Sequence, residues 1–295
     1  MGATGRIGWA GATAAAVSVN VLVIALLSME QWMDLVYQQT DEEFIPWFSS
    51  YWTQQWMSVK VSWYRLSSGG AKDPSVKRLA LYLQEQYRER VLEPVAETDD
   101  PQQIMARSTW IYLQHLDENL PRIAQQYDVP REQFHQRLQA IPAITQAPGA
   151  SLYELLHAEP LTELPAYSAF IERIRNAPRG LGDWSADPGI SAVAQQTSER
   201  LVDDLAVSGA AGALSALIGG PAGTTVSLGV ALFTAVSREN ARPASEAQLR
   251  KNLNAAFDDE WLGLMRSTEH GVLAGVHQLS GQIESGLRVP FRYQP

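Results

Sequence analysis

The stretch LAVSGAAGALSALIGGPAGTTVSLGVALFTAV, residues 205–236, contains no ionisable side chain and is rich in small residues. An uncharged run of this length predicts an element that lies in a membrane. Small residues recur at every fourth position, a spacing that lets helices approach closely in lipid. The predicted helix-packing residues are Ser208, Gly212, Ala216, Gly220, Gly223, Ser227, Ala231 and Ala235. We therefore interpret residues 205–237 as a Gly/Ala-rich membrane segment.

This segment has three alternative arrangements. One helix over the whole run would measure about 48 Å, whereas each arm on either side of GGPAG, residues 219–223, would measure about 20 Å. The leading interpretation is a single tilted or kinked span, because carboxylates precede the run and basic residues follow it, as in a return to the cytoplasm. The basic residues are Arg238, Arg242, Arg250 and Lys251. A re-entrant hairpin and a helical hairpin inside a soluble core are the alternatives.

The N-terminus carries a second uncharged run, residues 7–29, between Arg6 and Glu30. Its length suffices to span about 30 Å of hydrocarbon, and no convincing cleavage site follows it. We therefore expect residues 1–30 to form an uncleaved signal-anchor helix, with a cleaved leader as the alternative. The positive-inside rule then places the N-terminus in the cytoplasm and residues 31–204 outside.

The segment 44–66 is unusually aromatic and predicts one helix. A single helical face carries Ile45, Phe48, Trp52, Trp56, Val59 and Trp63. Because tryptophan favours a boundary between water and an apolar phase, this helix is interpreted as lying on the bilayer surface or, equally, as the central helix of a soluble core. The predicted membrane-interface residues are Trp47, Trp52, Trp56 and Trp63.

Start signals for helices follow along the chain. Asp-Pro pairs precede residues 75, 102 and 189, and a carboxylate before a proline caps a helix that begins at that proline. SLYE, residues 151–154, fits a capping box. No segment alternates with period two, so the fold class is all-α. The expected architecture is a helical bundle-like extracytoplasmic domain with an N-terminal transmembrane helix and a Gly/Ala-rich membrane helix or hairpin.

The expected domain order is linear. After the anchor at 1–30 come an acidic helical domain at 31–178, a linker and lead-in helix at 179–204, the membrane segment at 205–237 and a helical tail at 238–295. The tail carries a narrow apolar stripe, which predicts pairing with its own domain or with a partner chain. The stripe consists of Val272, Val276, Leu279, Ile283 and Leu287.

The composition excludes several classes of function. The net charge is −9 and no basic stripe is visible, which argues against a nucleic-acid partner. Cysteine is absent, which excludes disulfides and thiolate sites.

The spacings that catalysis requires are also missing. No nucleophile elbow, zinc-protease motif or phosphate-binding loop is found. His270 and His277 share a helical face but lie about 10 Å apart, too far for one metal ion. The acidic groups 41–43 and 258–260 are interpreted as solvated faces. No cofactor is expected.

These features predict a non-enzymatic structural or accessory component of an assembly in a bacterial-type inner membrane. Its expected partners are the lipid bilayer and other membrane helices, from copies of itself or from different proteins. An oligomeric channel built from residues 205–236 is one alternative. A membrane-tethered hydrolase with dispersed carboxylates is another, although no residue spacing supports it.

Overall fold

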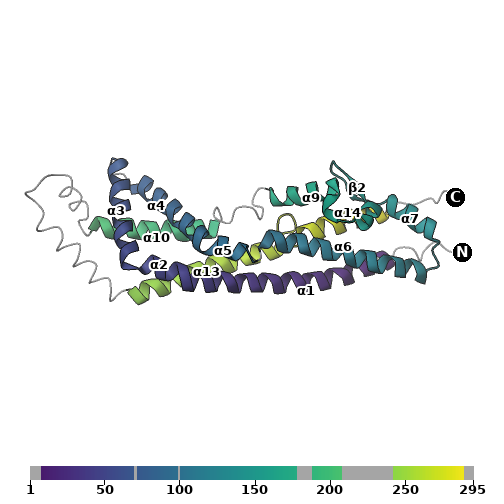
Figure 1. Cartoon of the computed structure of the whole chain (residues 1–295), viewed down its shortest axis with the longest axis horizontal. Coiled ribbons are helices and arrows are strands. Elements are labelled where there is room, and N and C mark those ends of the chain that lie inside the picture. Colours follow the sequence, from purple (N-terminus) through teal and green to yellow (C-terminus); the bar gives the residue numbers. More distant parts are fainter. Residues whose placement is uncertain (1–7, 70–71, 99, 178–187, 208–241, 289–295) are drawn as a thin grey trace, which may run out of the picture. The chain divides into compact units, whose positions relative to one another are not determined.

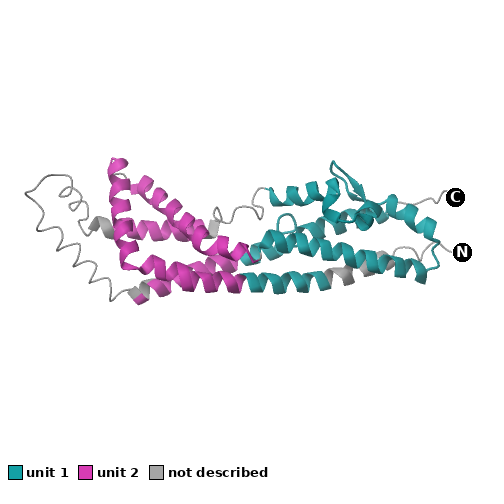
Figure 2. Cartoon of the chain, in the orientation of Figure 1, with its two compact units in different colours: residues 1–32, 99–183, 261–295 teal, residues 33–98, 184–260 magenta. Residues whose placement is uncertain are grey.

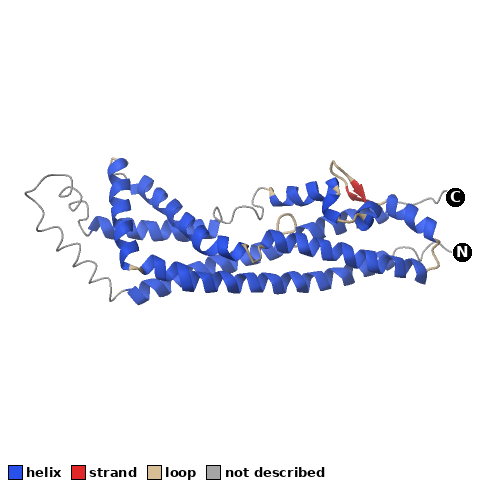
Figure 3. Cartoon of the chain, in the orientation of Figure 1, coloured by secondary structure: helices blue, strands red, loops and turns tan. Residues whose placement is uncertain are grey.

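The computed structural model describes residues 8–69, 72–98, 100–177, 188–207 and 242–288. Helices dominate these residues (Figure 3), which confirms the all-α prediction. One small sheet is present: β1 (Pro142–Ile144) pairs antiparallel with β2 (Ala150–Ser151). These strands are too short to produce a recognisable alternating pattern, so the sequence did not predict them.

The chain forms two compact units (Figure 2). Unit 1 combines residues 1–32, 99–183 and 261–295, and unit 2 combines residues 33–98 and 184–260. Each unit is therefore assembled from segments that are separated in the sequence.

Unit 2 contains the end of α1 and a series of helices drawn in Figure 1. Its elements are α1 (Gly8–Gln39), η1 (Thr40–Phe44), α2 (Ile45–Ser49), α3 (Tyr51–Ser67), α4 (Lys72–Tyr87), η2 (Arg88–Leu92), α5 (Glu93–Ala96), α10 (Pro188–Val207) and most of α13 (Arg242–Arg266). Helix α10 packs mainly against α4, and α3 contacts both.

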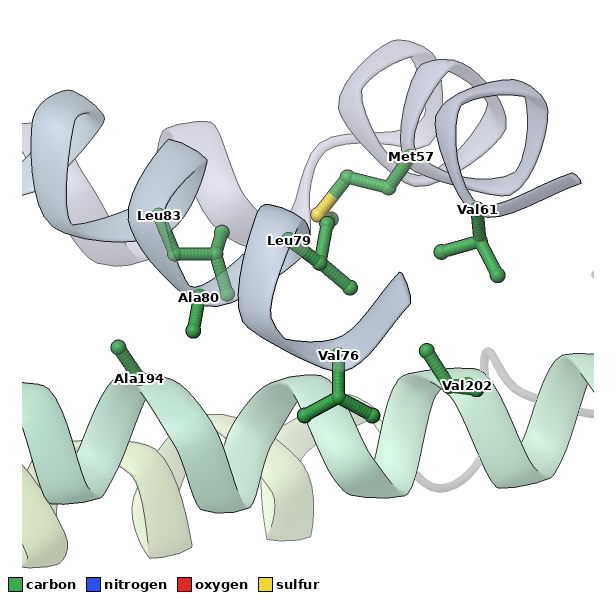
Figure 4. Close-up of a cluster of buried hydrophobic side chains, with 8 residues drawn as sticks. All are labelled: Met57, Val61, Val76, Leu79, Ala80, Leu83, Ala194 and Val202. Atoms are coloured by element: carbon green, nitrogen blue, oxygen red, sulfur yellow. The ribbon is translucent and has the colours of Figure 1, made fainter. Parts of the chain in front are cut away.

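Buried apolar side chains from α3, α4 and α10 form one cluster in unit 2 (Figure 4). Its members are Met57, Val61, Val76, Leu79, Ala80, Leu83, Ala194 and Val202. A second buried group surrounds Tyr87, whose ring contacts Phe44 and stacks on Phe257 at 5.7 Å. The Tyr87 hydroxyl lies 2.6 Å from the hydroxyl of Thr40, so this buried polar group is paired.

Unit 1 contains the remaining helices. Its elements are the first part of α1, α6 (Pro101–Gln126), α7 (Arg131–Gln139), β1, β2, α8 (Leu152–His157), η3 (Leu161–Glu163), α9 (Pro165–Arg175), the end of α13 and α14 (Ala274–Arg288). Helix α14 packs against β1 and α6. The guanidinium of Arg137 donates hydrogen bonds to the carbonyl oxygens of Gly286 and Leu287, in the last turn of α14.

Two expected start signals act as caps. Asp100 accepts a hydrogen bond from the amide of Gln103 at 2.7 Å, and α6 begins at Pro101. Ser151 and Glu154 form the reciprocal capping box of α8. Helix α10 begins at Pro188, as the third Asp-Pro pair indicated.

Helix α1 differs from the expected anchor. It continues to Gln39, past the expected end at residue 30, and buries Val21, Ala25 and Met29 on one side. Within the described ranges, no helix combines the length and apolar character needed to cross a membrane. The predicted N-terminal transmembrane helix is therefore not confirmed.

Candidate functional site

Helix α3 exposes a continuous aromatic face, which we call the tryptophan face. Trp52 is 80% exposed, Trp63 is 64% exposed and Trp56 is 56% exposed. Val59 and Leu66 extend the face and are also at least half exposed. Exposing such large apolar side chains to water is unfavourable in free energy. A cluster of them at the surface therefore indicates an interaction site.

The opposite side of α3 is buried. Thr53, Met57 and Val61 are spaced by four residues and are each less than 9% exposed. Met57 and Val61 belong to the cluster shared with α4 and α10 (Figure 4). At 100° per residue, this buried stripe and the tryptophan face lie on nearly opposite sides of the helix. The position of α3 in unit 2 therefore holds the tryptophan face outward.

The aromatic segment is not one helix, and this corrects the single face predicted for 44–66. Ser50 has an extended backbone, with ψ of 144°, and its side chain accepts a hydrogen bond from the amide of Thr53. A serine that caps the following helix in this way ends α2 and starts α3. Ile45 and Phe48 consequently lie on α2, where Ile45 is buried.

Trp47 is separated from the three other predicted interface tryptophans. It lies on α2 and packs against the buried cluster. The guanidinium of Arg90 lies 4.6 Å from the centre of its ring, and the ring of Phe44 lies 5.5 Å away. Trp47 therefore contributes to the packing of unit 2, in contrast to Trp52, Trp56 and Trp63.

The charges around the tryptophan face are sparse. Helix α3 contains no carboxylate, and its only cations are Lys60 and Arg65. The ammonium of Lys60 lies 4.0 Å from the centre of the Tyr82 ring and 5.6 Å from that of Trp56. Burial raises the pKa of the Tyr82 hydroxyl, which therefore stays neutral beside Lys60 at physiological pH. The face is thus apolar, with one cation held at its edge by aromatic rings.

The tryptophan face belongs to the end of unit 2 at which α10 ends. Val202, near the end of α10, shares the buried cluster with Val61 of α3. Asp203 pairs with Lys72 at 2.7 Å, and Lys72 begins α4 just after the loop that follows α3. The ion pair raises the pKa of Lys72. The described residues that lead into the uncharged run therefore lie near α3.

The first part of α13, which follows the uncharged run, contacts the N-terminal residues of unit 2. Arg250 of α13 pairs with Asp41 at 2.5 Å, and Asp258 accepts a 2.6 Å hydrogen bond from Tyr37. Burial and the proximity of Asp258 both raise the pKa of Tyr37, so this hydroxyl remains a donor. Asp203 and Arg250 thus belong to the same unit. Residues 208–236 lie outside the described residues, so the interpretation of the uncharged run as a single span stays a prediction.

The predicted helix-packing residues fall outside the described residues. All eight, from Ser208 to Ala235, lie in the stretch 208–241. Their predicted role stays a prediction.

The histidine and carboxylate side chains that could act as metal ligands or catalytic groups are dispersed over the described residues. In the described ranges, no group of three or more histidine, aspartate or glutamate side chains is placed to hold a metal ion. Asp41 and Asp258, one from each acidic group of the sequence, are engaged with Arg250 and Tyr37. A separate aromatic stack, which the sequence did not reveal, brings His157 to 4.1 Å from Tyr153 and 6.1 Å from His135 between ring centres.

Comparisons of the sequence with protein-family models, with curated proteins and with solved structures find no match.

Proposed function

We propose that this chain is a non-enzymatic structural or accessory component of an inner-membrane assembly, and that its tryptophan face lies at the bilayer surface. The observation that carries the proposal is the outward exposure of Trp52, Trp56 and Trp63 on one helix that is anchored from behind. Tryptophan has an apolar body and a polar N–H group, and it is enriched where a membrane meets water. Transfer of three such side chains out of water contributes on the order of 3–6 kcal/mol.

Lipid suits this face better than a protein groove for two reasons. The face has no carboxylate that would repel anionic headgroups, and Lys60 lies at its edge. The uncharged run 205–236 begins where α10 ends, beside α3. A bilayer that accommodates the run would therefore also meet the tryptophan face.

The same geometry supports a hairpin for the uncharged run. The flanking helix α10 and most of α13 belong to unit 2, which favours an even number of crossings or a re-entrant loop. The Gly/Pro-rich centre at 219–223 has the composition of a chain reversal. The small-residue ridges of the two arms would then pack against each other or against helices of other chains.

The proposed topology places unit 2 outside the inner membrane. The positive-inside rule, applied to Arg6, favours an orientation in which residues 31–204 are extracytoplasmic. Because α13 packs on residues 37–41, it lies on the same side as they do.

Contact between the tryptophan face and lipid is tested with site-specific probes, which the cysteine-free chain permits. Trp56→Cys and, as a matched control, Glu89→Cys on the same unit are labelled with an environment-sensitive fluorophore after reconstitution of the full chain. We expect lipids brominated near the headgroup to quench the probe at 56 strongly and the probe at 89 weakly. Equal quenching at the two positions would contradict the proposal.

The hairpin is tested by labelling intact cells with a maleimide that does not cross membranes. Arg200→Cys and Lys251→Cys lie on exposed positions of α10 and α13. We expect both cysteines to react from outside the inner membrane. A single span would leave one of the two protected until the membrane is permeabilised.

The assembly role is tested in the predicted small-residue ridges. Gly212→Leu and Gly220→Leu add bulk where close helix packing is expected, so we expect a smaller detergent-solubilised complex. The labelled positions 200 and 251 report on whether the described units stay folded. Migration of the complex unchanged from that of the wild type would argue against the assembly role.

A further inference from the structure

Unit 1 contains a cleft of about 820 Å³ between α6 and α9, closed at its base by α8 and η3. This volume falls within the range of small-molecule sites. Its floor is apolar and is formed by buried side chains from three separate helices, Leu113, Leu155 and Ile171. Trp110 lies at the rim and is 45% exposed.

The cleft has a different charge at each end. Helices α6 and α9 run in opposite directions (Figure 1), so the start of α6 and the end of α9 share one end of the cleft. Arg107 and Arg175 line that end together with Glu172, whose carboxylate accepts a hydrogen bond from Asn176. Asp117 and Glu159 line the part next to η3. An anionic group is therefore attracted to the arginine end and repelled from the other.

Arg175 has unused hydrogen-bonding capacity. Its Nε atom is buried and has no hydrogen-bond partner among the described residues. Burial raises the pKa of the Tyr167 hydroxyl to about 12, and the positive charge of Arg175 opposes that rise. Arg175 lines the cleft and is half-buried, and its guanidinium carries further N–H donors that a ligand oxygen can accept from.

We propose that this cleft binds a single-chain carboxylate, whose head pairs with Arg175 and Arg107 and whose apolar tail lies on Leu113, Leu155 and Ile171. Guanidinium groups match the planar geometry of a carboxylate and bind it with charge-assisted hydrogen bonds. The acidic end of the cleft sets the direction in which the ligand lies. The site is independent of the tryptophan face, which lies in the other unit.

The test uses the full chain in lipid nanodiscs, with empty nanodiscs subtracted. Sodium octanoate is titrated by calorimetry and compared with octanol and octyltrimethylammonium, which share its tail and change only its head. We expect saturable binding of octanoate, weaker binding of octanol and none of the cation. Equal binding of the three compounds, or no binding of octanoate, would overturn the proposal.

Variants locate the site. Arg175→Gln removes the charge and is expected to weaken octanoate binding at least tenfold, whereas Arg122→Gln, an exposed residue of α6 outside the cleft, leaves binding unchanged. If Arg175→Gln lowers the melting temperature, Arg107→Gln serves as a second variant at the exposed rim. Unchanged affinity in a folded Arg175→Gln or Arg107→Gln variant would show that octanoate binds elsewhere.

Discussion

Helices α3 and α14 each carry an apolar stripe with a spacing of three or four residues, and the two stripes have opposite environments. On α14, Val276, Leu279 and Ile283 are at most 6% exposed, because the helix packs against α6 and β1. On α3, the tryptophan face is exposed, and the buried stripe is formed by other residues. Helical periodicity thus identifies an apolar face without identifying what covers it.

The two helices also differ in how closely a neighbour can approach. A Cβ atom on Gly275 of α14 would overlap the side chain of Thr109 on α6, and one on Gly286 would lie 3.1 Å from Ile141. These glycines let α14 lie directly against its own unit. The outward side of α3 instead carries tryptophans, whose size suits a soft or fluid surface better than close helix packing.

The largest contrast is expected from truncating one residue of each stripe. Leu279→Ala leaves a cavity in a fully buried site and is expected to lower the free energy of unfolding by about 2–5 kcal/mol. Trp63→Ala, on the exposed face of α3, is expected to cost less than about 1 kcal/mol. Chemical denaturation of the full chain in mild detergent measures both. Similar losses in the two variants would mean that the tryptophan face is covered by protein.

A smaller effect is expected at the close contact of α14. Gly275→Ala should destabilise the protein by about 1–3 kcal/mol, because Thr109 must move. Gly281→Ala is the matched control on the same helix: nothing lies within 4 Å of its added methyl group, so it should be neutral or stabilise by up to about 1 kcal/mol. Thermal unfolding separates the two outcomes, and equal melting temperatures would refute the close approach.

The side-chain cap at the start of α3 is expected to contribute about 1 kcal/mol to the free energy of unfolding. Ser50→Ala removes the side chain that accepts from the amide of Thr53 and so leaves that donor unpaired. Ser58→Ala, in the interior of the same helix, removes only a hydroxyl bonded to the carbonyl of Gln54 and should have little effect. If Ser50→Ala is as stable as the wild type, α2 and α3 would be able to form one continuous helix.

The smallest effect is expected at α8 and depends on pH. Hydrogen bonds from the amide and hydroxyl of Ser151 lower the pKa of Glu154, so the stabilisation is present above the ordinary carboxyl pKa and is lost as the pH falls through the lowered value. Glu154→Gln should therefore reduce the loss of stability between about pH 5 and pH 3, by less than about 1 kcal/mol. Melting temperatures of the wild type and of Glu154→Gln across this range report the difference. The same dependence on pH in both proteins would exclude a contribution of the Glu154 carboxylate.

Several local features were predictable because they depend on a few adjacent residues. Asp100 and Ser151 cap helices where the sequence indicated, since a side-chain oxygen reaches an amide three residues later in any context. The break at Ser50 depends on the same chemistry, but the aromatic spacing on both sides of it resembles that of one helix, so the sequence pattern does not reveal it. Trp47 was consequently grouped with residues from which it is separated.

The cleft of unit 1 was beyond the reach of sequence patterns. Arg107 and Arg175 belong to helices far apart in the chain, and no motif connects them. The same reason explains why the contact between Asp41 and Arg250 was not foreseen, although it decides that the uncharged run begins and ends in one unit. Long-range contacts depend on how helices pack, which their individual periodicities do not specify.

The sequence by itself determined that this chain is helical and where several of its helices begin, because propensity and capping act over neighbouring residues. Only the tertiary structure decided which apolar stripe is buried, that Trp52, Trp56 and Trp63 face outward, and that α10 and α13 belong to one unit. These outcomes depend on which surfaces fill the same space, and close packing makes that a property of the whole unit.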